Sequence, residues 1–128
     1  MKGWMNEGWF SNKFHHQLAQ ELKEFVEIVN NKLNIEAVFI VGSFADGTNN
    51  EASDLDIIVV SSDFNYYCLN TRRKILSGLI KKSSVKIDLY CYTTQEYISM
   101  CNDEIWKNKA RVEVWKNEHE KDTSGIIK

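Results

Sequence analysis

The chain has 128 residues, of which 43% are hydrophobic and 27% are charged, the ordinary balance of one folded domain with a core. Its net charge of −2 argues against broad nucleic-acid binding, which needs a basic face. No apolar run approaches membrane-spanning length, and residues 1–7 lack the apolar stretch of a signal peptide. The three cysteines are scattered without a Cys-x-x-Cys pair, so we expect reduced thiols in a cytoplasmic protein. They are Cys68, Cys91 and Cys101.

The hydrophobic pattern predicts two helical stretches, over about residues 12–31 and within residues 64–82. The face of the first is formed by Phe14, Leu18, Leu22, Phe25 and Val29. We also expect a single domain over residues 1–128, with its core between about 14 and 118 and a polar tail over 119–128.

Three apolar runs predict strands at about residues 37–41, 55–60 and 85–91. A strand–helix–strand order favours a right-handed parallel crossover, so the second and third strands should lie side by side. The first strand should run antiparallel to the second, because its exit and the entrance of the second must meet at one site. The predicted fold is α/β (α+β), a small mixed sheet with helices packed on it.

The most informative segment joins the first two predicted strands. Gly42 and Ser43 follow the first strand, and Gly42 allows close approach of the backbone to a phosphate while the Ser43 hydroxyl can donate a hydrogen bond. Asp54 and Asp56 open the second strand and point to the same face, because strand side chains alternate. Two carboxylates on one face are the ligands that Mg²⁺ prefers together with water and substrate phosphates. The segment therefore predicts nucleotidyl transfer.

Gly-Ser-x-x-x-Gly followed by Ser-Asp-x-Asp resembles the signature of the DNA polymerase β-type nucleotidyltransferase superfamily, and within it the minimal nucleotidyltransferase domains. That resemblance implies a third carboxylate on a later strand, which Asp88 supplies. It also implies a helix start at residues 93–97 and a closing edge strand at 111–115. Position 46, commonly basic in minimal domains, is Asp46 here, so a basic contact to phosphate from this position is not expected.

The resemblance implies an enzyme that transfers AMP from ATP to a hydroxyl acceptor with two Mg²⁺ ions. Asp54, Asp56 and Asp88 are the expected metal ligands and catalytic residues, and Gly42 and Ser43 the expected contacts to the nucleotide. It further implies a HEPN-type toxin as the acceptor partner, with this chain as its antitoxin. Modification of a small molecule such as an aminoglycoside, and a binding protein that retains the fold without catalysis, are the alternatives. The acceptor, the base preference and the oligomeric state stay open.

Several conspicuous residues have simpler interpretations. His15 and His16 are adjacent on a helix and face different directions, so a surface position is favoured over a metal site. The basic run over residues 72–74 is typical of a solvated helix face. The N-terminal aromatic residues either cap the core or form a partner surface, and the sequence favours neither. These are Trp4, Trp9 and Phe10; Trp106 and Trp115 are expected in the core or at the sheet edge.

Overall fold

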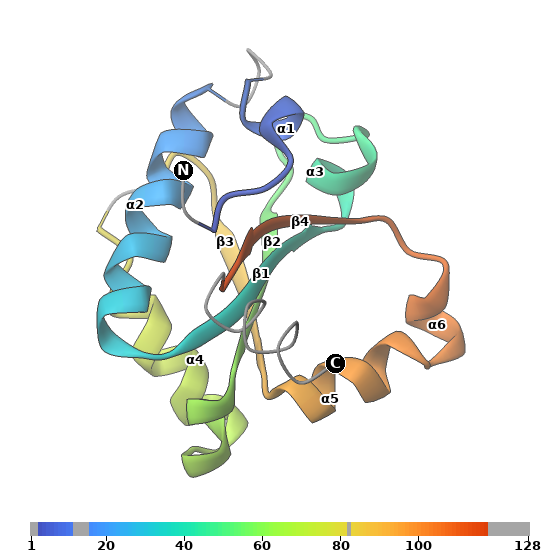
Figure 1. Ribbon diagram of the computed structural model, residues 1–128. Coiled ribbons are helices and arrows are strands. Elements are labelled where there is room, and N and C mark those ends of the chain that lie inside the picture. Colours follow the sequence, from blue (N-terminus) through green and yellow to red (C-terminus); the bar gives the residue numbers. More distant parts are fainter. Residues whose placement is uncertain (1–2, 12–15, 82, 118–128) are drawn as a thin grey trace.

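A computed structural model describes residues 3–11, 16–81 and 83–117. Its centre is a four-stranded mixed sheet in the order β3-β2-β1-β4 (Figure 1). The strands are β1 (Ile35–Val41), β2 (Leu55–Ser61), β3 (Ile87–Tyr92) and β4 (Arg111–Lys116). β1 pairs antiparallel with both β2 and β4, whereas β2 and β3 are parallel. The predicted fold class and strand directions are confirmed, and the expected edge strand is β4.

Helices cover both faces of the sheet (Figure 1). One face carries α2 (His16–Lys32) and α4 (Leu69–Ser77), with α1 (Glu7–Ser11) packed against α2. The other carries α5 (Thr94–Cys101) and α6 (Glu104–Lys107). α3 (Ser43–Asp46) follows β1, and the 3-10 helix η2 (Ser62–Tyr66) follows β2. Among the described residues no helix is long and apolar enough to cross a membrane.

The larger core lies between the sheet and the α2/α4 layer, because alternate residues of the strands point there. It includes Ile57, Val59 and Leu89, each at most 4% exposed. A smaller apolar cluster lies on the opposite face around Val41 and Ile58 and is bordered by aromatic residues. These are Phe39, Tyr90, Tyr92, Tyr97 and Trp106. The sheet is therefore apolar on both faces, and its second face is only partly covered.

The N-terminal aromatic segment belongs to the core. Trp9 and Phe10 are 9% and 7% exposed, and Trp4 packs edge-on against Phe10 with ring centroids 5.4 Å apart. The Trp9 indole Nε1 donates a hydrogen bond of 2.9 Å to the carbonyl of Phe44 in α3. The structure thus favours core capping over an exposed partner surface for this segment.

The helix predicted within residues 64–82 is present as α4, and extended Tyr67 and Cys68 separate it from η2, which buried Phe64 anchors. The prediction of a solvated basic run needs correction, because Arg72 is 5% exposed. Residues 12–15, with Phe14 and His15 of the first predicted helix, and 119–128 of the tail lie outside the described residues. His16 is exposed, as predicted.

The helix start predicted at residues 93–97 is confirmed. Thr93 caps α5, accepting from the Glu96 N–H, while the Glu96 side chain accepts from the Thr93 N–H. This reciprocal arrangement satisfies two N–H groups that the first turn of a helix leaves unpaired. Trp115 is buried and Trp106 is half-buried. Cys91 is buried, Cys68 is exposed and all three cysteines are free thiols.

Candidate active site

Two carboxylates face each other across the parallel pair of strands. The register places Asp56 of β2 directly opposite Asp88 of β3, and both are half-buried. Their neighbours Leu55 and Leu89 are buried in the larger core. Because strand side chains alternate, Asp56 and Asp88 lie on the second face of the sheet, where the aromatic cluster is. The sequence prediction that these two residues lie side by side is confirmed.

The electrostatics of Asp56 reflect this pairing. Burial raises the pKa of Asp56 above its usual value, and the Asp88 carboxyl raises it further through its charge and through hydrogen bonding. The charge of Asp54 adds a smaller effect in the same direction. Two carboxylates held this close disfavour joint ionisation, and a cation between them relieves the repulsion.

Asp54 lies at the entrance of the site. It precedes β2, its side chain is 39% exposed, and its Oδ2 is 4.0 Å from the Nζ of Lys86. Within the described part of the chain, no three or more His, Cys, Asp or Glu side chains cluster closely enough to form a metal cage. The geometry therefore joins Asp56 and Asp88 as a pair, with Asp54 near enough to act on Asp56 by its charge.

Gly42 brings the backbone of the loop after β1 against this pair. Its φ of 73° and ψ of −151° are a conformation that only glycine adopts readily. A Cβ at this position would be 2.5 Å from the Oδ2 of Asp56. The backbone of Gly42 therefore lies against an Asp56 carboxylate oxygen, and the predicted approach of a phosphate to Gly42 stays a prediction.

Ser43 begins α3, and the turn after it is closed by its own backbone. The Ser43 carbonyl accepts hydrogen bonds from the N–H groups of Gly47 and Thr48. No described residue forms a hydrogen bond with the Ser43 hydroxyl. The hydroxyl is therefore available for a ligand at the edge of the carboxylate pair.

Asp46 stabilises the same turn. Its Oδ1 accepts hydrogen bonds from the Thr48 N–H at 3.0 Å and from the Thr48 hydroxyl at 2.5 Å. These bonds lower the pKa of Asp46, and Gly47 has the positive φ of 83° that the turn requires. An acidic residue at position 46 thus has a local structural role that a basic residue would not fulfil.

An aromatic wall borders the carboxylates and was not assigned to the site from the sequence. Tyr90 follows Asp88 by two residues on the same face; burial raises its pKa, and the charges of Asp56 and Asp88 raise it further. Trp106 of α6 lies edge-on to Tyr90, with ring centroids 6.5 Å apart. The alternation of β3 places Tyr90 beside Asp88 from sequence alone, but nothing in the sequence indicated that α6 returns to this strand.

Arg72 is a second residue that the sequence misplaced. It donates hydrogen bonds to the carbonyls of Tyr67 and Cys91 and forms an ion pair with Glu96, with 2.6 Å between Nη1 and Oε1. Arg72 and Leu76 are four residues apart, and both lie on the buried face of α4. Arg72 thereby connects α4, the end of β3 and the start of α5.

Residues 22–122 match the family model of the nucleotidyltransferase domain, and the match includes the Gly42–Ser43 loop and all three aspartates. The chain belongs to the nucleotidyltransferase domain family. The protein is accordingly an enzyme of the nucleotidyltransferase class, and the paired carboxylates lie inside the matched region.

Similar proteins agree with this family. A protein of Methanocaldococcus jannaschii, provisionally named a protein adenylyltransferase, is 27% identical over 73 residues, which are 57% of this chain and 73% of that protein. A crystal structure from Sulfolobus solfataricus, provisionally assigned as a nucleotidyltransferase, aligns with a TM-score of 0.61 and 27% identity. That alignment covers 77% of this chain and 80% of the other. A toxin–antitoxin structure with AMP-PNP aligns over 81% of this chain and 80% of its own, with a TM-score of 0.46 and 15% identity, too low to argue from.

Proposed function

We propose that this nucleotidyltransferase transfers AMP from ATP to a hydroxyl group of a protein acceptor, in a reaction that depends on Mg²⁺. The observation that carries the proposal is the Asp56–Asp88 pair packed against the backbone of Gly42. This arrangement joins a site for a divalent cation to a loop that a phosphate can approach. The name of the Methanocaldococcus relative as a protein adenylyltransferase supports the adenylyl group and a protein acceptor.

The residues present fit Mg²⁺. Asp56 and Asp88 offer hard oxygen ligands, and burial together with the neighbouring Asp88 carboxyl raises the pKa of Asp56, an effect that a bound cation would oppose. Mg²⁺ typically takes one or two carboxylates and completes its coordination with water and phosphate oxygens, so an all-protein cage is not required. We assign Asp54, Asp56 and Asp88 as ligands for two ions. Bound there, Mg²⁺ would hold the triphosphate and acidify the acceptor hydroxyl.

The protein's own groups have distinct tasks in this scheme. The Gly42 backbone and the Ser43 hydroxyl hold the β- and γ-phosphates and disperse the charge of the leaving pyrophosphate. Asp88, on a different strand from Asp54 and Asp56, lies on the acceptor side and receives the proton of the acceptor hydroxyl. The aromatic wall of Tyr90 and Trp106, whose ring centroids are 6.5 Å apart, borders one side of the pair.

For the acceptor we retain the HEPN-type toxin implied by the sequence resemblance, with this protein as the antitoxin that modifies it. The Asp56–Asp88 pair, with Asp54 at its entrance, serves catalysis and is not needed for neutralisation by contact alone. Mass spectrometry of proteins that co-purify with the chain tests this directly. A partner that carries an added adenylyl mass supports it, whereas adenylylation of an aminoglycoside with an unmodified partner would favour the small-molecule alternative.

The catalytic assignment is tested by two isosteric substitutions. Asp56→Asn should abolish the Mg²⁺ dependence of ATP binding in titration calorimetry, because a carboxylate ligand of the Mg²⁺ ions is lost. Asp88→Asn should retain Mg²⁺·ATP binding within a few-fold while transfer falls by about a hundredfold or more, because it acts mainly in the transition state. Equal ATP affinity of the wild-type protein in Mg²⁺ and in EDTA would contradict the metal assignment. Near-wild-type transfer by Asp88→Asn would show that Asp88 has no part in the reaction.

A further inference from the structure

The outer edge of β3 presents unpaired peptide groups. The Leu55 N–H donates to the carbonyl of Lys86, so residue 86 faces β2 and, by alternation along a parallel ladder, Ile87 and Leu89 face outward. The Cys91 carbonyl, which faces the same outer side, accepts a hydrogen bond from Arg72. No described residue forms a hydrogen bond with the outward peptide groups of Ile87 and Leu89.

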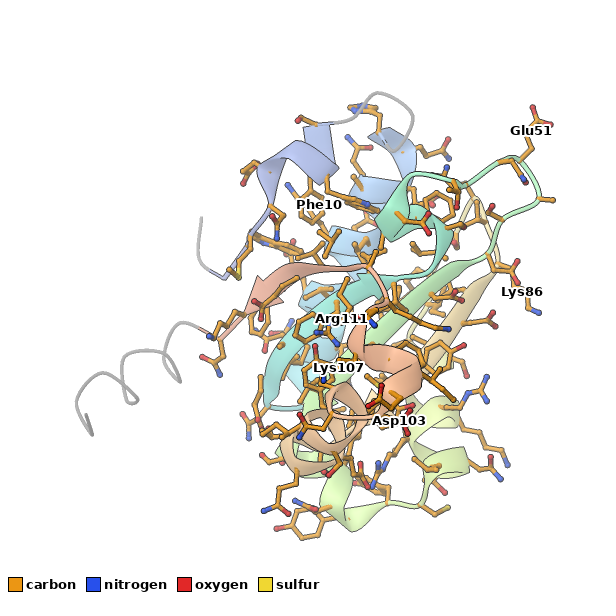
Figure 2. All side chains as sticks on the ribbon, turned by 90° about the vertical axis from the view of Figure 1, so that its right-hand side faces the viewer. Phe10, Glu51, Lys86, Asp103, Lys107 and Arg111 are labelled. Carbon is orange, nitrogen blue, oxygen red and sulfur yellow. The ribbon has the colours of Figure 1, made fainter. Side chains whose placement is uncertain are left out.

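A cavity of about 280 Å³ lies at this edge, between β3 and α4. Its lining residues are Asn70, Arg73, Lys74, Ser77, Ile87 and Leu89. Arg73 and Lys74 are exposed. Lys86, which precedes β3, projects outward (Figure 2), and its Nζ lies 4.0 Å from the Asp54 carboxylate. The edge is thus locally basic in a chain whose net charge is −2. An open strand edge is usually covered or protected, because it offers hydrogen bonds to another chain.

β3 has an acidic site on one face and basic side chains beside the other. Asp88 lies on the face of the carboxylate pair, whereas Ile87 and Leu89 point to the opposite face, where Arg73 and Lys74 line the cavity. A strand added beside β3 would share this alternation. A residue of that strand next to Asp88 would project toward the carboxylates, and the residues before and after it would project toward the two cations.

We propose that β3 binds an extended segment of the acceptor protein as an added strand, in which the modified Ser, Thr or Tyr is flanked on both sides by Asp or Glu. The inference rests on the proposed transfer to a protein. Peptide hydrogen bonds to Ile87 and Leu89 provide affinity, and the Arg73–Lys74 pair selects acidic flanks. The strand pairing presents the hydroxyl to Asp88.

The transfer step follows from that placement. The acceptor hydroxyl oxygen forms a bond to the α-phosphorus of ATP, and the bond from that phosphorus to the bridging oxygen of pyrophosphate breaks. The hydroxyl proton passes to the Asp88 carboxylate, and pyrophosphate leaves with the bonding electron pair. One AMP group is thereby esterified to the acceptor side chain for each ATP consumed.

The first experiment uses short synthetic peptides as probes of the full chain. A fluorescent Glu-Glu-Tyr-Glu-Glu peptide should bind in an anisotropy titration at low salt, more tightly than Lys-Lys-Tyr-Lys-Lys, with affinity falling as salt is raised. The double reversal Arg73→Glu/Lys74→Glu should weaken binding of the acidic peptide by about tenfold or more. The control variant Lys107→Glu/Lys116→Glu makes the same charge change on α6 and on β4 at the opposite edge of the sheet. Its affinity for the acidic peptide should stay within about twofold of wild type.

The second experiment tests the strand pairing itself. Ile87→Pro removes the outward N–H at the first residue of an edge strand, a position where proline is tolerated, and should weaken the acidic peptide at least tenfold. Ile87→Ala loses the same side chain but keeps the N–H, so it should bind the peptide nearly as wild type. Melting temperatures and Mg²⁺·ATP affinity, measured on both variants, exclude a loss through unfolding.

The outcomes separate this inference from the proposed function. Peptide binding that depends on Arg73 and Lys74 without AMP transfer would support the docking edge and refute the transferase assignment for such acceptors. Three results would overturn the docking edge: equal binding of acidic and basic peptides, equal effects of Ile87→Pro and Ile87→Ala, or binding of a short single-stranded RNA with the same Arg73–Lys74 dependence. In each of these cases, Mg²⁺·ATP binding is measured separately and still tests the proposed function.

Discussion

Substitution of Gly42 by alanine should weaken nucleotide binding and also lower the stability of the fold. The φ of 73° and ψ of −151° cost a residue with a Cβ about 1–3 kcal/mol. The new methyl group would also meet Asp56 Oδ2 at 2.5 Å, and a contact that short forces the carboxylate to move. We therefore expect a melting temperature lower by roughly 4–12 °C and Mg²⁺·ATP binding weaker by about tenfold to a hundredfold.

Two other glycines serve as matched controls. Gly47→Ala carries a similar backbone penalty, because φ is 83°, but a Cβ there meets nothing within 4 Å. It should lower stability by about 1–2 kcal/mol and leave nucleotide affinity within a few-fold. Gly8→Ala lies in α1 with nothing within 4 Å and should be neutral or slightly stabilising.

Calorimetric ATP titrations in Mg²⁺ and thermal melts of the three variants decide the question. Equal losses of ATP affinity in Gly42→Ala and Gly47→Ala would show that the effect is general destabilisation of the loop. An unchanged affinity in Gly42→Ala would refute the role of the Gly42–Asp56 contact in binding.

Three further predictions concern charges and anchors. In EDTA, Asp56→Asn should be more stable than wild type at neutral pH, because the pKa of Asp56 is raised in the folded state, so the wild-type protein loses stability as the pH rises above 3.8 and through the folded-state pKa. Thermal melts from pH 3 to 8 should show that the stability difference between the two proteins vanishes in acid and shrinks when Mg²⁺ is added. A stability difference that does not depend on pH would contradict this prediction. Arg72→Leu should lower the free energy of unfolding in urea by about 1–3 kcal/mol, because two backbone carbonyls lose their hydrogen-bond donor. Arg72→Lys should recover only part of that stability. Full recovery by lysine would show that the charge alone matters. Deletion of residues 1–10 should destabilise the domain by several kcal/mol, because Trp9 and Phe10 are core residues, and an unchanged melting temperature would disprove that.

The parts of the fold that were predictable are those fixed by local alternation and connection rules. Strand directions follow from the apolar runs and from the need to join β1 to β2 at one site, and β3 follows from the crossover. Asp88 was placed beside Asp56 by the same logic. These features depend on residues close in sequence and on general chain geometry, so the sequence contains them.

The features that were missed depend on contacts between distant segments. Arg72 looked like part of a solvated basic run because its partners, the Cys91 carbonyl and Glu96, are 19 and 24 residues away. The 3-10 helix η2 was not predicted, because it depends on the burial of Phe64 in the core. The choice between core and surface for Trp9 likewise depended on its bond to Phe44, 35 residues away.

These distant contacts also explain how so small a domain holds its site in place. The carboxylates lie on adjacent strands whose other face is packed into the larger core, so their spacing is fixed by the peptide ladder. The loop that approaches them contains only the four-residue α3 and a turn closed by local hydrogen bonds to Ser43 and Asp46. Its support comes from buried Phe44 and from the Trp9 indole that donates to the Phe44 carbonyl. The N-terminal aromatic segment therefore acts on the site through the core, because loosening it would release the loop that positions Gly42 against Asp56.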